Sequence, residues 1–372
     1  MIYLDNAATT KPDPVAVKAA EKFLSEAFFN PSALYGGGVA VHSELTRARN
    51  TVLGCIADKN RFDLIFTSCG TEADNQALFS RRHGNIVTTA GEHAAIYQTC
   101  MELKNRGTEV RFAPLLPDGR VDVSALMQLV DEKTSLVSVM HVNNETGAVN
   151  DILSIAKQVK WKNARCLFHS DGVQAFGKLP VRLTSDIDLY SVSAHKIGGL
   201  KGVGALIKKK GLTIPPLIYG GGQESALRSG TENTFGIMCF ATAAERRFSI
   251  LQESAKQVGT LRETLWSRLE SDRLLRISPK DGTPYILTVA VKNLRGEILQ
   301  RLIEERGVLV GTGSACSSKH PYSRVIQACG VDRQFLNGVL RISFSPDTTA
   351  EETEKAAVAI NDAVRDLTER TK

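Results

Sequence analysis

Short apolar runs alternate with segments of helical length between about residues 60 and 210, and this alternation constrains the fold more than any other feature of the sequence. Such alternation predicts a largely parallel sheet that is covered by helices on both faces. We expect strands at 63–67, 85–89, 109–113, 135–142, 165–169, 187–193 and 202–207. Because ligands bind at the carboxyl ends of strands in such sheets, the polar residues that follow these runs are expected to form one site.

A second region begins near Phe240 and mixes both kinds of element. We expect helices at 241–273, 296–305 and 350–368, and strands at 285–292, 308–310 and 339–344. With 372 residues the chain is long enough for two domains. The prediction is therefore an α/β fold with a large domain, residues 12–240, that contains a mostly parallel seven-stranded sheet, and a smaller α+β domain formed by residues 1–11 and 241–372.

Composition excludes several classes of protein. The net charge of +6 comes from dispersed basic residues, so we expect no nucleic-acid partner. No apolar run approaches the roughly 20 residues of a membrane-spanning helix, and the first residues contain neither a basic leader nor an apolar stretch. A cytoplasmic location without a membrane partner is the expectation. The seven cysteines include no C-x-x-C pair, which argues against a disulfide framework and against a zinc site, so no metal is expected.

Lys196 leaves the end of a predicted strand next to Ser193 and His195 and enters the glycine-rich stretch 197–204. A lysine in this setting can form a Schiff base with a carbonyl cofactor when burial and its neighbours lower its pKa. A lone lysine of this kind is more often a surface residue in a turn. The prediction of a cofactor lysine therefore depends on the residues that accompany it.

Three accompanying residues suit a pyridoxal ring. Asp171 ends a predicted strand and can pair with a protonated pyridine nitrogen, which the ring needs in order to act as an electron sink. Gln174 can reach the ring hydroxyl, and His93 can stack on the ring or transfer protons. Taken alone, Asp171 would more often be a helix cap and His93 a structural residue.

The segment 68–75 follows a predicted strand and opens a predicted helix, so it presents free backbone N–H groups and hydroxyls to an anion. This arrangement is typical of a phosphate site, and helix capping by Ser68 or Thr71 is the alternative. No G-x-x-x-x-G-K-[ST] motif is present, and the glycines from 198 to 204 do not fit G-x-G-x-x-G, so nucleotide-binding folds lose their usual support.

Short motifs extend over nearly the whole chain, at 3–10, 68–75, 92–93, 141–147, 171–174, 193–196, 228–231, 313–316 and 340–343. In residue type and order they resemble the motifs of cysteine desulfurases of the NifS/IscS type, which belong to the class V aminotransferase family of fold type I pyridoxal phosphate enzymes. The resemblance implies the same fold, the cofactor pyridoxal 5'-phosphate and the conversion of L-cysteine to L-alanine.

The resemblance also implies roles for individual residues. Lys196 would carry the cofactor, Asp171 would pair with its ring nitrogen, Gln174 would meet its ring oxygen, and His93 would stack on it and assist proton transfer. The residues implied for the phosphate are Gly70, Thr71, Ser193 and His195. Asn144 would contact cofactor and substrate, Arg341 would hold the substrate carboxylate, for which the guanidinium fork is suited, and Asn30 would contact the substrate.

Cys316 matches the catalytic cysteine of these enzymes and lies among small residues. As a thiolate it would take sulfur from bound cysteine and carry it as a persulfide to an acceptor protein of the iron–sulfur scaffold or thiouridylase type, for cluster assembly or thio-modification. Thr231 would bind the phosphate of the neighbouring subunit's cofactor, so a homodimer with shared active sites is implied.

The sequence departs from the family's pattern in two segments. In 30–38 the usual histidine is missing and three glycines follow instead, and the segment 316–330 is shorter than in desulfurases that feed iron–sulfur scaffolds. The nearest alternative is a selenocysteine lyase or another class V lyase or transaminase. A docking scaffold with little catalysis and a nicotinamide-dependent oxidoreductase are alternatives from other classes. The thiol of Cys316 favours sulfur transfer, because a plain transaminase needs no such nucleophile.

Overall fold

The structure is a computed structural model that describes residues 1–80, 83–270, 272–312 and 322–370. Its larger sheet has the strand order β2-β8-β7-β6-β5-β3-β4. The bounds of these strands are Phe62–Thr67 (β2), Asn85–Thr89 (β3), Val110–Ala113 (β4), Thr134–Ser138 (β5), Leu167–Asp171 (β6), Leu189–Ser193 (β7) and Gly204–Lys209 (β8). Strand β8 pairs antiparallel with β2 and β7, and the other pairs are parallel. The predicted mostly parallel seven-stranded sheet is confirmed.

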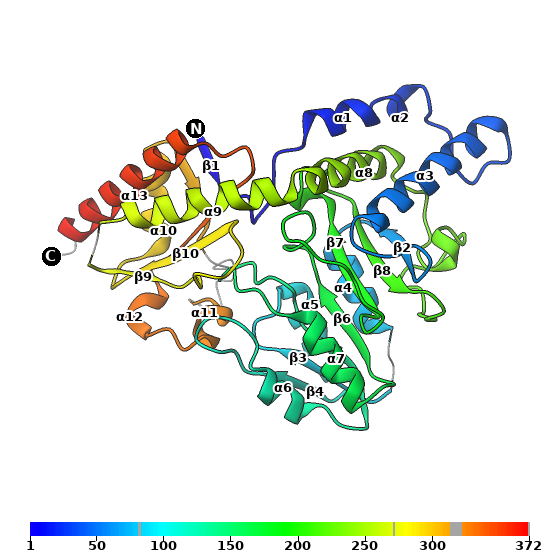
Figure 1. The fold of residues 1–372 in the computed structure, drawn as a ribbon, viewed down its shortest axis with the longest axis horizontal. Helices are drawn as coiled ribbons and strands as arrows, with labels where there is room; N and C mark the ends of the chain where they lie inside the picture. The colour runs from blue at the N-terminus through cyan, green and yellow to red at the C-terminus, as the bar shows by residue number, and fades with distance from the viewer. Residues whose placement is uncertain (81–82, 271, 313–321, 371–372) are drawn as a thin grey trace.

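Helices cover both faces of this sheet (Figure 1). One face packs against α1 (Pro14–Ala20), α3 (Gly36–Gly54), α6 (Val123–Leu129), α7 (Ile152–Lys162) and α8 (Thr234–Ser249), and the other against α4 (Gly70–Phe79) and α5 (Ala94–Asn105). Within β2, Leu64 and Phe66 belong to the first core and Ile65 to the second. This split follows from the strand period of two residues, and it explains why the strands read as continuous apolar runs.

A second core lies beside the large sheet. It is built on the antiparallel strands β9 (Leu274–Arg276), β10 (Ile286–Val291) and β12 (Val339–Ser343), and on the parallel pair β1 (Ile2–Leu4) and β11 (Val308–Val310). Helices α9 (Leu251–Arg268), α10 (Gly296–Glu305) and α13 (Ala350–Arg370) pack together over it (Figure 1). The remaining short elements are α2 (Lys22–Ser25), α11 (Arg324–Ala328), α12 (Arg333–Leu336) and the 3-10 turns η1 (Ala194–Lys196) and η2 (Glu224–Ala226).

The long helix expected at 241–273 is wrong in its extent. The structure has two helices, α8 and α9, which are separated at Ile250. Helix α8 begins earlier than expected, because the side chain of Asn233 accepts a hydrogen bond from the backbone N–H of Gly236 and caps the first turn. Helix α8 packs in the core of the large sheet and α9 in the second core. The expected domain boundary after residue 240 therefore falls inside α8, and the division into two domains stays a prediction.

Among the described helices, none is both long enough and apolar enough to cross a membrane.

Two residues of α13, one buried in the second core and one exposed, allow the contribution of this core to stability to be tested. Ile360 has 0% exposed surface, whereas Val358 on the same helix is 60% exposed. We expect Ile360→Ala to lower the free energy of unfolding by about 2–5 kcal/mol, because it removes buried methyl groups and leaves a cavity. Val358→Ala should change it by less than about 0.5 kcal/mol. Urea unfolding followed by circular dichroism measures both, and equal effects would contradict the packing of α13 described here.

Candidate active site

Three segments that are far apart in the sequence meet at the carboxyl ends of β6 and β7. Asp171 is the last residue of β6, and Lys196 lies in η1 directly after β7. His93 is the N-cap residue of α5, which follows β3 of the same sheet. The parallel pairing of β6 with β7 places Asp171 opposite Ser191. The expected convergence of strand ends therefore brings the predicted cofactor residues together.

Lys196 is held by the N-terminal segment of the chain. Its Nζ donates hydrogen bonds to the carbonyl oxygens of Ala7, at 2.7 Å, and Ala8, at 2.8 Å. Burial lowers the pKa of Lys196 to about 8, with a further lowering by the charge of Arg341, while Asp171 and Asp5 act in the opposite direction. A lysine with this pKa is partly a free amine near neutral pH, which is the form that reacts with a carbonyl group.

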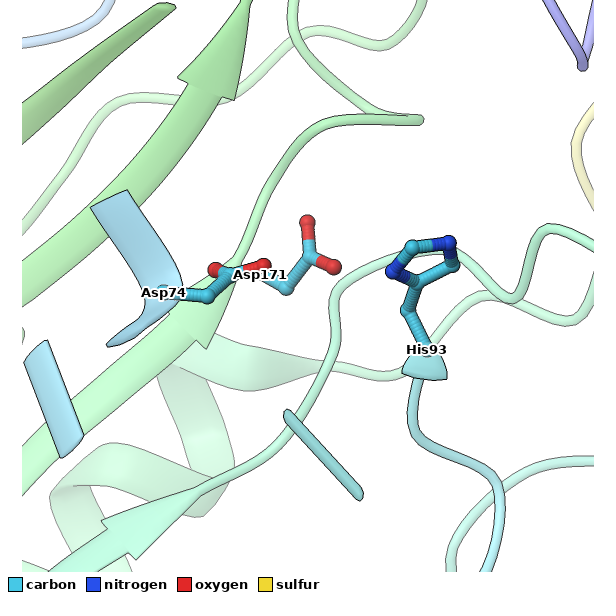
Figure 2. A group of neighbouring side chains, drawn as sticks. All are labelled: Asp74, His93 and Asp171. Carbon is cyan, nitrogen blue, oxygen red and sulfur yellow. The ribbon is translucent and has the colours of Figure 1, made fainter. Parts of the chain in front are cut away.

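Asp171 lies between Asp74 and His93, with its carboxyl group turned toward the imidazole (Figure 2). Ligand atoms of these three residues lie within 4.8 Å of one another. Burial raises the pKa of Asp171, although His93 and Lys196 oppose this effect, and its carboxylate also accepts a hydrogen bond from the backbone N–H of Val173 at 2.9 Å. The pKa of His93 is lowered mainly by desolvation. Its Nδ1 accepts a hydrogen bond from the N–H of Ala95 at 3.2 Å, as a neutral imidazole can.

Gln174 is fixed at both ends of its amide. Its Nε2 donates to the carbonyl oxygen of Ala7 at 2.8 Å, and its Oε1 accepts from Lys178 Nζ at 2.8 Å. Lys178 is buried, which holds its pKa well below its usual range, and the charge of Lys196 adds to this. Both lysines line the same small cavity, together with Thr10 and Arg247. The sequence analysis missed Lys178, whose only signal was its position four residues after Gln174.

The start of α4 and the end of β7 form a pocket suited to an anion. Gly70 begins α4, and a Cβ atom at this position would lie 2.8 Å from Val173 Cγ2 and 3.5 Å from Ser193 Cβ, so only glycine fits. Ser193 is buried, and its Oγ has no hydrogen-bond partner among the residues that the structure describes. Free N–H groups of a first helical turn beside an unpaired hydroxyl are a donor set that fits a phosphate. Thr71, the second residue of α4, is exposed.

His195 supports this pocket from η1. Its Nδ1 lies 3.1 Å from Thr9 Oγ1, and its carbonyl oxygen accepts hydrogen bonds from the N–H and hydroxyl of Thr10, both at 2.9 Å. Burial lowers the pKa of His195 to about 4, so the ring is neutral near pH 7. His195 can therefore offer a hydrogen bond to an anion without bringing a positive charge.

Arg341 reaches the site from β12. Its guanidinium group donates to the carbonyl oxygen of Asn144 at 2.9 Å and forms an ion pair with Asp5, also at 2.9 Å. Within the described ranges its buried Nε has no hydrogen-bond partner. The guanidinium is thus oriented by two partners and keeps one donor for a ligand. Asp5 is a further residue that the sequence analysis did not single out, although it lies in the motif at 3–10.

Three predicted residues are not joined to this group. Thr231 is exposed and lies between β8 and α8. Asn30 is also exposed, and its side chain accepts a hydrogen bond from the N–H of Ser32 at 2.9 Å. Cys316 lies in 313–321, outside the described residues. The residues that flank this segment are fixed at the site, because Gly311 pairs with Arg341 and Ser323 donates to the carboxylate of Glu145 at 2.5 Å.

Comparisons with known proteins identify relatives over nearly the whole chain. The aminotransferase class-V family matches residues 2–355. A cysteine desulfurase of Cereibacter sphaeroides is 39% identical, with 95% of this chain and 93% of the relative covered. The cysteine desulfurase NifS of Azotobacter vinelandii is 34% identical, with 95% and 90% covered. A solved structure described as a NifS-like protein superposes with a TM-score of 0.92 at 36% identity, over 98% of this chain and 100% of the other. This chain therefore belongs to the class-V aminotransferase family.

Proposed function

We propose that this protein is a cysteine desulfurase, which binds pyridoxal 5'-phosphate at Lys196 and converts L-cysteine to L-alanine. The observation that carries the proposal is the environment of Lys196, whose pKa is lowered to about 8 beside Asp171 and His93. The family uses pyridoxal phosphate in general, and relatives named cysteine desulfurase match 95% or more of this chain.

The residues present fit this cofactor. Lys196 Nζ would bind its carbonyl carbon, and Asp171 would pair with its ring nitrogen. The second hydrogen of Gln174 Nε2, beyond the one given to Ala7, is available for the ring oxygen. Ser193 Oγ and the N–H groups of Gly70 and Thr71 would hold the phosphate. When bound, the cofactor supplies an electron sink that stabilises negative charge at the substrate Cα.

The protein residues then have separable tasks. Arg341 Nε, with Asn144, would hold the carboxylate of cysteine, and the amine of Lys196 or the neutral imidazole of His93 would move the Cα proton. Cys316 would attack the sulfur of the substrate as a thiolate. An S–S bond forms as the Cβ–S bond breaks, the electron pair of the broken bond stays on the carbon fragment, and protonation of that fragment gives alanine. The persulfide sulfur would pass to an acceptor protein of the iron–sulfur scaffold or thiouridylase type.

A homodimer with shared active sites is part of the proposal. Thr231 is exposed on its own subunit, where a second copy can meet it. The segment 28–39 also presents large apolar side chains to solvent, among which Leu34 is 96% exposed. A patch of this kind is typical of a protein interface. The exposed apolar residues of this segment are Phe28, Leu34, Tyr35 and Val39.

The first prediction concerns the reaction itself. Supplied with pyridoxal phosphate, L-cysteine and a thiol reductant, the protein should release alanine and sulfide in equal amounts. Lys196→Ala should lose both products because the amine is gone, and Cys316→Ala should lose both because no thiolate removes the sulfur. Alanine and sulfide assays measure this. Cofactor binding without alanine from cysteine would refute the function, and alanine from selenocysteine alone would indicate a selenocysteine lyase.

The second prediction concerns pH. Cofactor binding requires the neutral amine of Lys196, so its rate should rise with pH to a plateau with a midpoint near 8, the lowered pKa of this lysine. Arg341→Gln should move the midpoint to higher pH, because the charge of Arg341 lowers the pKa of Lys196. Stopped-flow visible absorbance on cofactor-free protein gives both midpoints. A midpoint above pH 10 in the unmodified protein would show that Lys196 is not desolvated.

The third prediction tests the shared site. Thr231→Asp places a negative charge where the partner's cofactor phosphate would lie, so this variant and Lys196→Ala should each be inactive. Subunit exchange between the two variants should restore about a quarter of the unmodified activity, because each mixed dimer then has one site with both native residues. If Thr231 instead serves its own subunit, mixed dimers contain only defective sites and no activity returns.

A further inference from the structure

Asp74 of α4 is a buried carboxyl group without a defined task in the site. The residue is 1% exposed, and it lies on the side of Asp171 away from His93 (Figure 2). Carboxylate oxygens of Asp74 and Asp171 lie within 4.8 Å of each other. Oδ1 of Asp74 has no hydrogen-bond partner in the part of the chain that the structure describes, and His169 Nε2 is 3.7 Å away from it. Asp74 is therefore a buried acceptor that faces another acid.

Among the described residues, the groups around Asp74 supply no cation for its charge. Asp171, Glu92 and Cys69 are all acids that oppose its ionisation, and its hydrogen-bond partner Ser191 is uncharged. Both ring nitrogens of His169 already have hydroxyl partners, Ser138 Oγ at 2.9 Å and Ser191 Oγ at 3.0 Å. Burial lowers the pKa of His169 to about 3, so its ring is neutral.

Two buried carboxylates this close cannot both be ionised, so the pair holds one proton. Asp171 is the better place for the negative charge. It accepts a hydrogen bond from the N–H of Val173, and it faces His93 and Lys196, which both favour its ionised form. Burial and the charge of Asp171 raise the pKa of Asp74 well above its usual range.

We propose that Asp74 is a positioning residue that holds this proton as a neutral acid, so that Asp171 carries the single negative charge of the pair. The inference rests on the proposed function in one respect, because the charge of Asp171 is needed for the ring nitrogen of the cofactor. A proton on Asp74 also gives its unpartnered Oδ1 a hydrogen to donate. If Asp74 were ionised, Asp171 would hold the proton and could not keep a ring nitrogen protonated.

Infrared spectroscopy of cofactor-free protein tests the location of the proton. The C=O stretch of a protonated carboxylic acid is separate from that of a carboxylate, and labelling aspartate with carbon-13 in the side-chain carboxyl distinguishes Asp74 from Glu92, whose pKa burial raises to about 8. At pH 7 the unmodified protein should show an isotope-shifted acid band. Asp74→Asn should lose this band. The isosteric control Asp171→Asn should keep it, because burial is the largest cause of the raised pKa of Asp74 and remains in this variant.

The opposite pattern, in which Asp171→Asn loses the band and Asp74→Asn keeps it, would overturn the proposal. The absence of any labelled acid band would also overturn it. Such a result would mean that Asp74 is ionised and paired with protonated His169 or with a metal ion. If Asp74→Asn does not fold, the Asp171→Asn protein decides alone by keeping or losing the band. Because these spectra need neither cofactor nor substrate, their outcome is independent of whether the protein acts on cysteine.

A second readout addresses the effect of Asp74 on the loaded enzyme. Asparagine has the shape and zero charge that we propose for Asp74, so Asp74→Asn should leave the pH midpoint of the cofactor's visible absorbance unchanged. Removing an ionised carboxylate would instead lower that midpoint, because a nearby negative charge stabilises the protonated form of the cofactor linkage. A downward shift would therefore overturn the proposal.

Discussion

Desolvation of Lys196 is the physical effect on which the rest of the site depends. Removal from water lowers its pKa to about 8, and the carbonyl oxygens of Ala7 and Ala8 hold its Nζ in place. These carbonyls are positioned by β1, which pairs with β11 in the second core, while Lys196 itself follows β7 of the large sheet. The reactive amine therefore requires that the two cores pack against each other correctly.

The charged side chains at the carboxyl ends of β6 and β7 influence one another as a group. Arg341 lowers the pKa of Lys196 but is itself paired with Asp5. Asp171 opposes the lowering of the pKa of Lys196 by burial, and it raises the pKa of its acidic neighbour Asp74. His93 and His195 are kept toward their neutral forms by desolvation. As a result the site can accept an anionic cofactor and an amino acid carboxylate while its imidazoles remain able to take up protons.

Local sequence patterns predicted most of the fold, because the strands of the large sheet alternate with helices and end in recognisable polar residues. The expected strand at 85–89 and helix at 296–305 coincide with β3 and α10. The break at Ile250 could not be predicted, since the amphipathic pattern continues through it. The contacts of Lys196 with Ala7 and of Asp74 with Asp171 also lay beyond the sequence. Both are made by tertiary packing, and they join segments roughly a hundred residues or more apart.

The central claim is that Lys196, and not another lysine, binds the cofactor. Lys178 is the other lysine that could bind the cofactor, because it is also desolvated and lines the same cavity. Borohydride reduction of the protein loaded with pyridoxal phosphate makes the lysine linkage permanent, and peptide mapping by mass spectrometry then locates it. The account predicts the modification on the peptide that contains Lys196. Modification of Lys178, or of neither lysine, would contradict it.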